Sequence, residues 1–537
     1  MSDQRPAAGA SDSRPSWSLE KIEALEARLS EPTTIGTIDL SGLEWLEQPR
    51  RLAADEQLPK VPARRAFGWA LYDWGSQSYA TLVQTFVIAV WLVDGFVPTG
   101  VDEAGRVAAE NANTGLLAAG NVIAGVVVAL LAPIVGARAD RAGRRKRWLG
   151  IHTTVVILAT AAIFFVRPDQ DALQANVLLG VALVSIGNVF FEFAAVNYNA
   201  TLSQVSNINN AGRVSGFGWG LGYIGGIVVL VLCLFGFVLP VMDGGAGWFG
   251  VTGDDGMAYR VVALCAAAWY AVFAIPLFLS IDEVQGSRAN RRLTRADKTE
   301  AAGGAVRAAG YGVVSFFANY GKLFKDLRRL SKVSPDAVRF LWASAVFRDG
   351  LNAVFLYGAV IGATVFGLNT TEIILFGIGA NVVAGITTII AGYLDDLFGS
   401  RTAIVASLVG VIVTGSVLAV FHNGGKPAFF ALALVLCAFI GPPQSASRSF
   451  LSRAVPSRNH GEVYGLYATT GRAVSFIGSS CFLLAGTIGV SLLGPSGNWV
   501  SILGLVFALL LGLVLFLVAT GRRTPRASTV DPHVTVH

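Results

Sequence analysis

Twelve blocks of mostly apolar residues follow one another along the chain, separated by shorter polar stretches. A helix needs roughly 20 apolar residues to cross a bilayer, and the blocks have about that length or more. They lack the alternation of apolar and polar positions that is typical of transmembrane strands. Because a helix satisfies its own backbone groups in lipid, we predict an all-α integral membrane protein. The predicted helices cover residues 66–93, 112–136, 147–166, 174–199, 215–241, 258–280, 338–366, 371–394, 402–421, 427–451, 463–490 and 497–519.

The composition agrees with this prediction, because 53% of the 537 residues are hydrophobic and only 14% are charged. A soluble domain carries about 25% charged residues. The net charge of +6 does not indicate a nucleic-acid partner, because the basic residues gather in alternate loops, above all the loop around 138–147 and segment 281–337. Basic loops stay on the cytoplasmic side of a membrane. We therefore expect a multi-pass membrane protein with both termini cytoplasmic. As its location we expect a prokaryotic plasma membrane.

Polar segments also divide the chain into regions. Residues 281–337 separate the helices six and six, which predicts a basic cytoplasmic linker between an N-terminal six-helix bundle (65–280) and a C-terminal one (338–520). Residues 1–64 are rich in Ser, Pro, Ala and charge and contain no signal-peptide core, so we expect a largely disordered cytoplasmic tail. Residues 521–537 predict a short cytoplasmic C-terminal tail.

The two predicted bundles resemble each other in sequence. GARADRAGRRKR (136–147) follows the second apolar block, and GYLDDLFGSR (392–401) follows the eighth. LSQVSNINNAGRVSG (202–216) likewise corresponds to LSRAVPSRNHGEVYG (451–465). A repeat of six-helix units is the architecture of major facilitator transporters, which bind their solute between the halves. We therefore predict two pseudo-symmetric six-helix bundles.

The first of these loops is similar to the signature of that superfamily between its helices 2 and 3, a Gly…Asp-Arg-x-Gly-Arg-Arg pattern. The matching residues are Gly136, Asp140, Arg141, Gly143, Arg144 and Arg145, and Asp396 holds the position of Asp140 in the second half. A tight glycine turn would let Asp140 pair with an arginine or cap a neighbouring helix in one conformation and release it in another. The alternative is a plain basic anchor of the membrane topology.

Four further stretches carry a closer resemblance. They are WALYDWGSQSYATLVQTFV (69–87), NYNATLSQVSNINNAGRVSGFGWGLGYIGG (197–226), FRDGLNAV (347–354) and GPPQSASRSFLSRAVP (441–456). Together they resemble the autophagy-related vacuolar effluxer-like family, the "unknown major facilitator" branch of the superfamily. The resemblance runs from about residue 64 to 490 and implies a twelve-helix transporter fold, with amino-acid export as the activity of the best-studied members. Gly75-Ser76 and Arg348 depart from residues that the family often has at these positions.

Polar side chains inside the apolar blocks are the candidate functional residues, because a charge at the centre of a membrane helix costs roughly 2.5–3.5 kcal/mol on insertion scales. In the first helix they recur on one face. The candidates for substrate binding or coupling are Asp73, Gln77, Gln84, Asn188, Glu192, Arg348, Asp349, Asn352, Gln444 and Arg448. Three interpretations stay open: proton coupling through Asp73 or Glu192, a substrate site in which arginine holds a carboxylate, and a cytoplasmic-side gate of ion pairs without cargo contact. Asp349 has Arg348 and Arg448 as candidate partners.

A run of glycines in the fifth predicted helix has the spacing of a helix-packing surface. Small residues four positions apart let helices approach closely. These residues are Gly216, Gly218, Gly220, Gly222 and Gly226. No Lys-Ser/Thr follows them, so the run does not indicate a phosphate-binding loop.

We therefore predict a secondary active transporter that moves a small organic solute, amino acids as the family-based cargo, by alternating access, with protons as candidate coupling ions. The alternatives are export of another organic or drug-like solute, and a membrane sensor that keeps the fold without transport. The five histidines are scattered and the four cysteines lie singly in apolar blocks, so we expect no metal, no cofactor and no enzymatic activity. We expect the solute and the bilayer as partners, and a monomer.

Overall fold

The computed structural model describes residues 61–283, 335–455 and 457–520. The predicted tails and linker lie almost wholly outside these residues. Every regular element within them is a helix, and twelve continuous or segmented helices are long and apolar enough to cross a membrane. The predicted all-α fold with twelve transmembrane helices is confirmed. The spans are Ala63–Asp94, Glu103–Asp140, Arg145–Phe165, Gln170–Ala200, Ala211–Met242, Asp254–Ser280, Ala337–Thr364, Glu372–Phe398, Ser400–Val420, Gly425–Ala454, His460–Leu493 and Ser496–Thr520.

The first span is divided into three segments. Helix α2 (Ala63–Ser78) continues as a π-helix (Tyr79–Phe86) and then as α3 (Ile88–Asp94). In the π-helix, Thr85 Oγ1 donates a hydrogen bond of 2.9 Å to the Ala80 carbonyl. A π-helical turn inside an α-helix is rare and often marks a functional position. This one borders the cavity described below.

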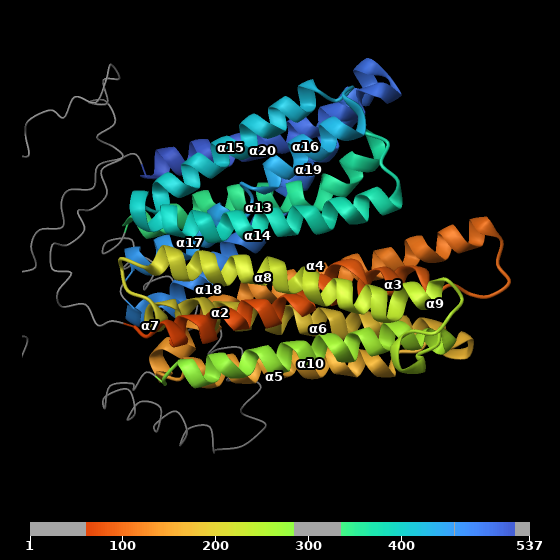
Figure 1. The fold of residues 1–537 in the computed structure, drawn as a ribbon, viewed down its shortest axis with the longest axis horizontal. Helices are drawn as coiled ribbons and strands as arrows, with labels where there is room; N and C mark the ends of the chain where they lie inside the picture. Colours follow the sequence, from red (N-terminus) through yellow and green to blue (C-terminus); the bar gives the residue numbers. More distant parts are fainter. Residues whose placement is uncertain (1–60, 284–334, 456, 521–537) are drawn as a thin grey trace, which may run out of the picture. The chain divides into compact units, whose positions relative to one another are not determined.

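The other helices of the first half pack around one core (Figure 1). Its largest fully buried side chains include Trp69, Tyr79, Tyr198 and Tyr270. The helices are α4 (Glu103–Ala142), α5 (Arg145–Ala162), α6 (Leu173–Ala200), α7 (Leu202–Val205), α8 (Ala211–Cys233), α9 (Leu239–Met242) and α10 (Met257–Ser280), with a π-helical turn (Leu234–Val238) between α8 and α9.

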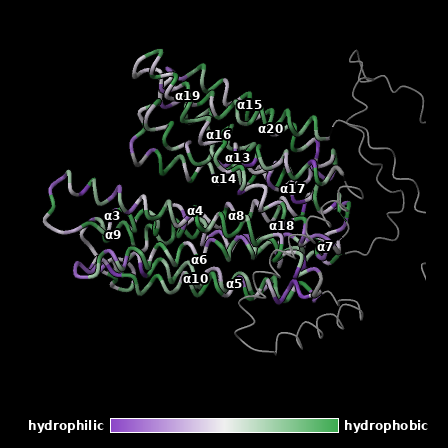
Figure 2. Tube along the Cα trace, turned by 180° about the vertical axis from the view of Figure 1, so that it is seen from behind, coloured by the Kyte–Doolittle hydropathy of each residue, from purple (hydrophilic) through white to green (hydrophobic). Residues whose placement is uncertain are grey.

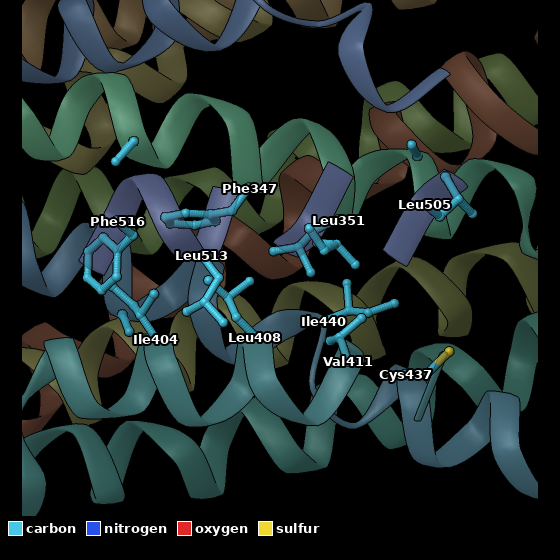
Figure 3. Packing of buried hydrophobic residues seen from close by; sticks show 14 of the residues in the cluster. Phe347, Leu351, Ile404, Leu408, Val411, Cys437, Ile440, Leu505, Leu513 and Phe516 are labelled. Carbon is cyan, nitrogen blue, oxygen red and sulfur yellow. The ribbon is translucent and has the colours of Figure 1, made fainter. Parts of the chain in front are cut away.

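The second half has its own core. Figure 3 shows Phe347 and Phe516 at one end of this core and Leu505 at the other, with aliphatic side chains between them. Pro442 and Pro443 lie in the first turn of α17. Because proline lacks the N–H that continues a helix, the tenth span is broken between α16 and α17. The helices are α13 (Pro335–Thr364), α14 (Thr370–Phe398), α15 (Ser400–Val420), α16 (Gly425–Cys437), α17 (Gly441–Ala454), α18 (His460–Ala473), α19 (Ile477–Leu493) and α20 (Val500–Thr520).

Glycines allow the two halves to meet at backbone distance. Helix α8 runs beside α14 of the other half (Figure 1). A Cβ atom at Gly216 would lie 2.7 Å from Gly392 Cα and 2.7 Å from the Thr388 carbonyl oxygen. Helix α4 meets α18 in the same way, since a Cβ at Gly136 would lie only 1.9 Å from the Gly461 carbonyl oxygen. Any side chain at these two positions would force the halves apart.

The predicted packing glycines of α8 face two different helices. Gly216 and Gly220 face α14 of the second half, and the other three face α2 and the π-helix that continues it in the first half. A Cβ at Gly218, for example, would lie 2.7 Å from the Trp69 ring. Helix α8 is therefore packed closely on both sides, against its own half and against the other one.

One end of the helices carries Arg145, Arg213 and Arg453, and we call it the basic end. Figure 2 shows hydrophobic residues along most of the helical length and a concentration of hydrophilic ones near α7, at this end. Helices α2, α8, α13 and α18 begin at the basic end, and α4, α6, α14 and α17 finish there. The sequence expectation that both termini are cytoplasmic would make the basic end the cytoplasmic one.

The close approach of α8 and α14 predicts that Gly220→Leu destabilises the protein. A Cβ at Gly220 would lie 2.5 Å from the Gly385 carbonyl oxygen, which belongs to a helix backbone and cannot rotate away. Overpacking of this kind costs about 1–3 kcal/mol. We expect a lower melting temperature of the purified protein and impaired transport.

The matched control is Gly115→Leu on α4, where a Cβ would meet no atom within 4 Å. An unchanged melting temperature together with unchanged transport in Gly220→Leu would contradict the packing role of this glycine.

Candidate functional site

A cavity of about 470 Å³ lies between the two halves. This volume falls in the range of small-molecule sites, which are mostly apolar with a few polar groups. The first half contributes residues of α2, of the π-helix and of α8, and the second half contributes most of the lining. The lining residues with a polar atom in the side chain include Gln77, Thr81, Thr85, Trp219, Tyr223, Asn352, Asn381 and Gln444.

The polar groups of this cavity are uncharged. Among the described residues that line it there are amides, hydroxyls and an indole, and no carboxylate, ammonium or guanidinium. Gln444 Nε2 lies 3.4 Å from Asn352 Oδ1, so α17 and α13 are joined at the cavity wall. The predicted candidates Gln77, Asn352 and Gln444 line the cavity, whereas Gln84 is half-buried and does not.

The charged candidates lie one helical turn closer to the basic end. Asp73 precedes Gln77 by four residues on α2, and Arg448 follows Gln444 by four residues on α17, so each charge lies on the same helix face as a cavity residue. Arg448 Nη1 donates to Asp73 Oδ2 at 2.9 Å. The two halves are therefore joined by an ion pair below the cavity floor.

This ion pair is sealed from solvent. The side chain of Arg448 is 1% exposed and that of Asp73 is 13% exposed. Arg448 also donates to Ser215, from Nη2 to the carbonyl oxygen at 2.7 Å and from Nε to Oγ at 3.1 Å. Its guanidinium carbon lies 4.6 Å from the centre of the Trp219 ring, which lines the cavity. Removing one charge of a buried pair leaves the other uncompensated, which costs several kcal/mol.

A second set of charges connects α6 with α18. Arg472 Nη2 donates to Glu192 Oε1, and it lies 3.3 Å from Asn188 Oδ1. The side chains of Glu192 and Arg472 are 27% and 29% exposed, so this pair is more open than the Asp73–Arg448 pair. The structure thus joins the predicted Asn188 and Glu192 to Arg472.

Arg348 and Asp349 do not pair with each other or with Arg448. Arg348 Nη2 donates to the Tyr467 carbonyl at 2.7 Å, and the guanidinium carbon lies 3.3 Å from the centre of the Tyr467 ring. Asp349 Oδ2 instead accepts the Gly478 amide at 2.7 Å, close to the start of α19. Asp349 therefore stabilises the start of α19. It pairs with neither of the two partners that the sequence suggested, Arg348 and Arg448.

At the basic end, Asp140 contacts the second half. The sequence predicts that this carboxylate pairs in one conformation and is released in another, and we call such a contact a latch. Asp140 Oδ1 accepts Arg145 Nε at 2.6 Å, and its Oδ2 accepts the backbone amide of Glu462 at 3.0 Å, in the first turn of α18. A carboxylate is favoured there by the unsatisfied amides and the dipole of a helix start. Arg145 also donates to the carbonyl of Ala200 at 3.2 Å, so the latch extends to the end of α6.

Asp396, which corresponds to Asp140 in the sequence repeat, makes the equivalent contact from the second half to the first. Its Oδ1 accepts the Gly212 amide at 2.8 Å and its Oδ2 accepts the Arg213 amide at 3.0 Å, in the first turn of α8. Its side chain also pairs with Arg213 and Arg453. Each half thus places one carboxylate, from the last turn of α4 or of α14, on the first turn of a helix of the other half.

Three other residues of the loop signature lie where α4 ends and α5 begins. Gly143 ends α4 with a φ of 61°, a left-handed conformation that favours glycine. Arg144 is exposed at the start of α5, and the side chain of Arg141 lies outside the described residues.

Three residues that take part in the ion pairs and hydrogen bonds of this site were not identified from the sequence. Arg472 lies inside the predicted helix 463–490, so the search for charges within apolar blocks could have found it. Asp395 accepts Arg453 Nη1 at 2.6 Å beside the Asp396 latch, and only its position next to Asp396 marks it in the sequence. Ser215 offered no signal, because its importance comes from the carbonyl and hydroxyl that it presents to Arg448.

Comparison with known proteins gives matches at three levels. A family model described as vacuole effluxer Atg22 like matches residues 203–488. The chain is 25% identical over 447 residues to the uncharacterized MFS-type transporter YxiO of Bacillus subtilis, covering 83% of this chain and 92% of that protein. It is also 25% identical over 294 residues to autophagy-related protein 22-1 of Aspergillus fumigatus, covering 52% of this chain but only 44% of that relative.

Solved structures with a similar fold are major facilitator transporters. The proton:xylose symporter XylE has a TM-score of 0.59 at 17% identity, covering 83% of this chain and 94% of the symporter. A bacterial homologue of the iron transporter ferroportin in an outward-facing state has a TM-score of 0.57 at 14% identity. The match covers 86% of this chain and 100% of the ferroportin homologue. At these identities the likeness shows the fold alone. Homology and fold together are those of transporters, not of enzymes.

The latch geometry predicts that Asp396→Asn opens the basic end more often. The substitution removes the ion pairs with Arg213 and Arg453 and weakens two contacts to the first turn of α8. Charge-assisted hydrogen bonds contribute about 1.5–3 kcal/mol each. We expect thiol labelling from the basic end to accelerate on the order of tenfold or more, since 1.4 kcal/mol is a factor of about ten in the open population.

The reporter is a cysteine at Ser445, a buried residue whose carbonyl accepts Ser215 Oγ across the halves, in a background without the four native cysteines. The control is Asp282→Asn, which removes an exposed surface pair with Arg65 at the same end. Labelling of Asp396→Asn at the parent rate would argue against a latch.

Proposed function

This chain belongs to the vacuole effluxer Atg22-like family, and from that premise we propose that it carries amino acids across a membrane by alternating access. The chain is an integral, multi-pass transporter of the major facilitator type, whose solutes are small molecules. Export is the direction that the family description supports. The relative YxiO, covered over 92% of its length, supports a bacterial plasma membrane as the location.

The observation that carries this proposal is the position of the cavity. It lies between the two halves and directly beyond the buried Asp73–Arg448 pair. A transporter of this architecture works by moving one half against the other around a central solute site. Opening of the basic end would part this pair together with the Asp140 and Asp396 contacts, and would expose the same cavity to the other side.

The cavity chemistry supports an amino acid with an uncharged side chain. The amides of Gln77, Asn352 and Gln444 each offer donors and acceptors, so they can bind both ends of a zwitterion. The apolar lining suits the side chain. The volume of about 470 Å³ is large enough for such a solute and too small for a folded peptide.

Asp73 is the residue that we propose for proton coupling. It faces Arg448 from α17 and the hydroxyl-bearing ring of Tyr198 from α6. When the halves part, Asp73 loses this partner. Proton uptake in one state and release in the other would couple the cycle to a pH gradient.

A specific observation favours a second cargo class. The described lining contains no charged side chain and is mostly aliphatic and aromatic. An uncharged organic solute, including a drug-like one, would fit these walls without the cost of removing its charges from water. The third alternative, a membrane sensor that keeps the fold without transport, is separated from both by a flux measurement.

We expect the purified protein in proteoliposomes to transport one or more labelled amino acids, and to do so faster when a pH gradient is imposed. The panel would contain apolar and polar amino acids together with a set of uncharged organic solutes. Empty liposomes give the background, and collapse of the gradient with a protonophore isolates the coupled part.

Flux of uncharged organic solutes alone would replace the amino-acid cargo with the second class. No flux of any solute by a protein that melts cooperatively would favour the sensor.

We expect Asp73→Asn to lose gradient-driven accumulation, because an amide cannot take up the proton. Exchange of internal for external solute needs no net proton movement and should persist at a measurable rate. The cost of leaving Arg448 without its counter-ion should lower the melting temperature, so transport is compared at a temperature where the variant is folded.

The matched control is Asp243→Asn, an exposed position near the end of α9. Accumulation at the wild-type level in folded Asp73→Asn would remove Asp73 from the coupling mechanism.

A further inference from the structure

Beneath the cavity, the side formed by α6, α13 and α18 carries more positive than negative side chains. Arg348, Arg472 and Glu192 supply two guanidinium groups and one carboxylate in this region. The neighbouring Asp73–Arg448 pair is neutral by contrast. Asp349, the nearest acid in sequence to Arg348, is occupied with the Gly478 amide. Within the part of the chain that the structure describes, this region therefore carries one excess positive charge.

Arg348 is the residue of this group that forms no ion pair with the described residues. Its Nη2 and Nε donate to the carbonyl oxygens of Tyr467 and Ser344, at 2.7 Å and 3.3 Å, and its guanidinium stacks on the Tyr467 ring. No carboxylate of the described residues lies at ion-pair distance from it. Carbonyl oxygens orient a guanidinium but do not neutralise it. A charge inside a membrane protein is costly and is usually kept for a function.

The guanidinium is also held in a fixed orientation. A Cβ atom at Gly471 would lie 2.9 Å from Arg348 Nη2, so the guanidinium packs closely against the α18 backbone at this glycine. The stacked ring and the two carbonyl bonds restrict its rotation. A planar guanidinium that is oriented in advance binds a carboxylate with a smaller loss of entropy than a flexible ammonium would.

This region is within reach of the cavity. Arg348 precedes Asn352 by four residues on α13, which puts both on one face about 6 Å apart along the helix. Asn352 lines the cavity. The Glu192 and Arg472 side chains remain more than a quarter exposed. Arg448, by contrast, is buried and already paired with Asp73, so it is not available to a solute.

We propose that Arg348, with Arg472 beside it, binds the carboxylate of the transported solute at the floor of the cavity. This inference rests on the proposed function, since it takes the solute from that cavity, and it adds the chemical group that the site selects. A bound carboxylate supplies the missing negative charge and accepts from guanidinium N–H groups, a pairing that gives strong hydrogen bonds. An amino acid and an organic acid without an amino group share this chemistry.

The experiment measures binding to the purified full-length chain by ligand-induced shift of the melting temperature, independently of transport. Matched sets of probes are built on leucine, phenylalanine and glutamine. Each set contains the amino acid, its N-acetyl derivative, the corresponding 2-oxo acid, the amide of the carboxyl group and the decarboxylated amine. We expect probes with a free carboxylate to stabilise the protein in at least one set, and the amide and the amine of that set to bind at least tenfold more weakly.

The variant is Arg348→Gln, with Arg65→Gln as the matched control, because Arg65 forms an exposed pair with Asp282 away from the cavity. We expect Arg348→Gln to bind carboxylate probes about 10- to 100-fold more weakly, as loss of a charge-assisted hydrogen bond implies. Arg65→Gln should bind as the wild type. Arg348→Lys keeps the charge without the planar donor pair, and intermediate affinity is expected. This variant also covers the case in which Arg348→Gln fails to fold.

The outcomes separate this inference from the proposed cargo. Binding of 2-oxo and N-acetyl acids without the amino acids would support the carboxylate site and reject amino acids as cargo. Transport of amino acids with equal affinity in Arg348→Gln and the wild type would support the cargo and overturn the carboxylate site. Equal binding of the carboxylate-free probes, or no binding of any carboxylate, would also overturn it.

Discussion

The ion pair between Asp73 and Arg448 places two opposite charges where water is scarce, so each is compensated chiefly by the other. Because the two residues come from different halves, the halves cannot separate at this end without exposing or neutralising both charges. The hydrogen bonds from Arg448 to Ser215 extend this dependence to α8. The cavity begins one helical turn further on, so its floor exists only while the pair is formed. Closure of the site and connection of the halves thus have one physical cause.

Two kinds of contact surround this pair: close backbone packing at glycines, which involves no charge, and hydrogen bonds from carboxylates. Glycines on α8 and α4 let backbones of opposite halves touch, which gives a close but non-directional surface. The carboxylates of Asp140 and Asp396 then fix the position by binding the first turns of α18 and α8. A surface held by small residues can part without unfolding either half, whereas carboxylate contacts at its rim can be made and broken as units. This combination suits a protein in which first one end of the helices is closed and then the other.

The charged groups beneath the cavity have different surroundings and hence different proposed tasks. The Asp73 pair is sealed and neutral, which suits a gate that responds to protonation. The pair of Glu192 with Arg472 is partly open, and Arg348 beside it has no carboxylate partner among the described residues, which suits contact with a solute. The cavity walls above are uncharged. A solute would therefore be selected by shape and amide contacts along its length and by its charge only at the floor.

The sequence by itself determined the twelve helices, the repeated halves and the list of costly charges, because apolar length and charge inside it are local properties of the chain. It also identified Gln77, Asn352 and Gln444, which share helix faces with those charges. It did not decide which charges meet. Asp73 and Arg448 are 375 residues apart and could each have had several partners, and Arg472 was overlooked although it binds Glu192. Only the packing of the two halves settled these pairings, since it depends on which helix backbones approach closely enough for side chains of different halves to reach each other.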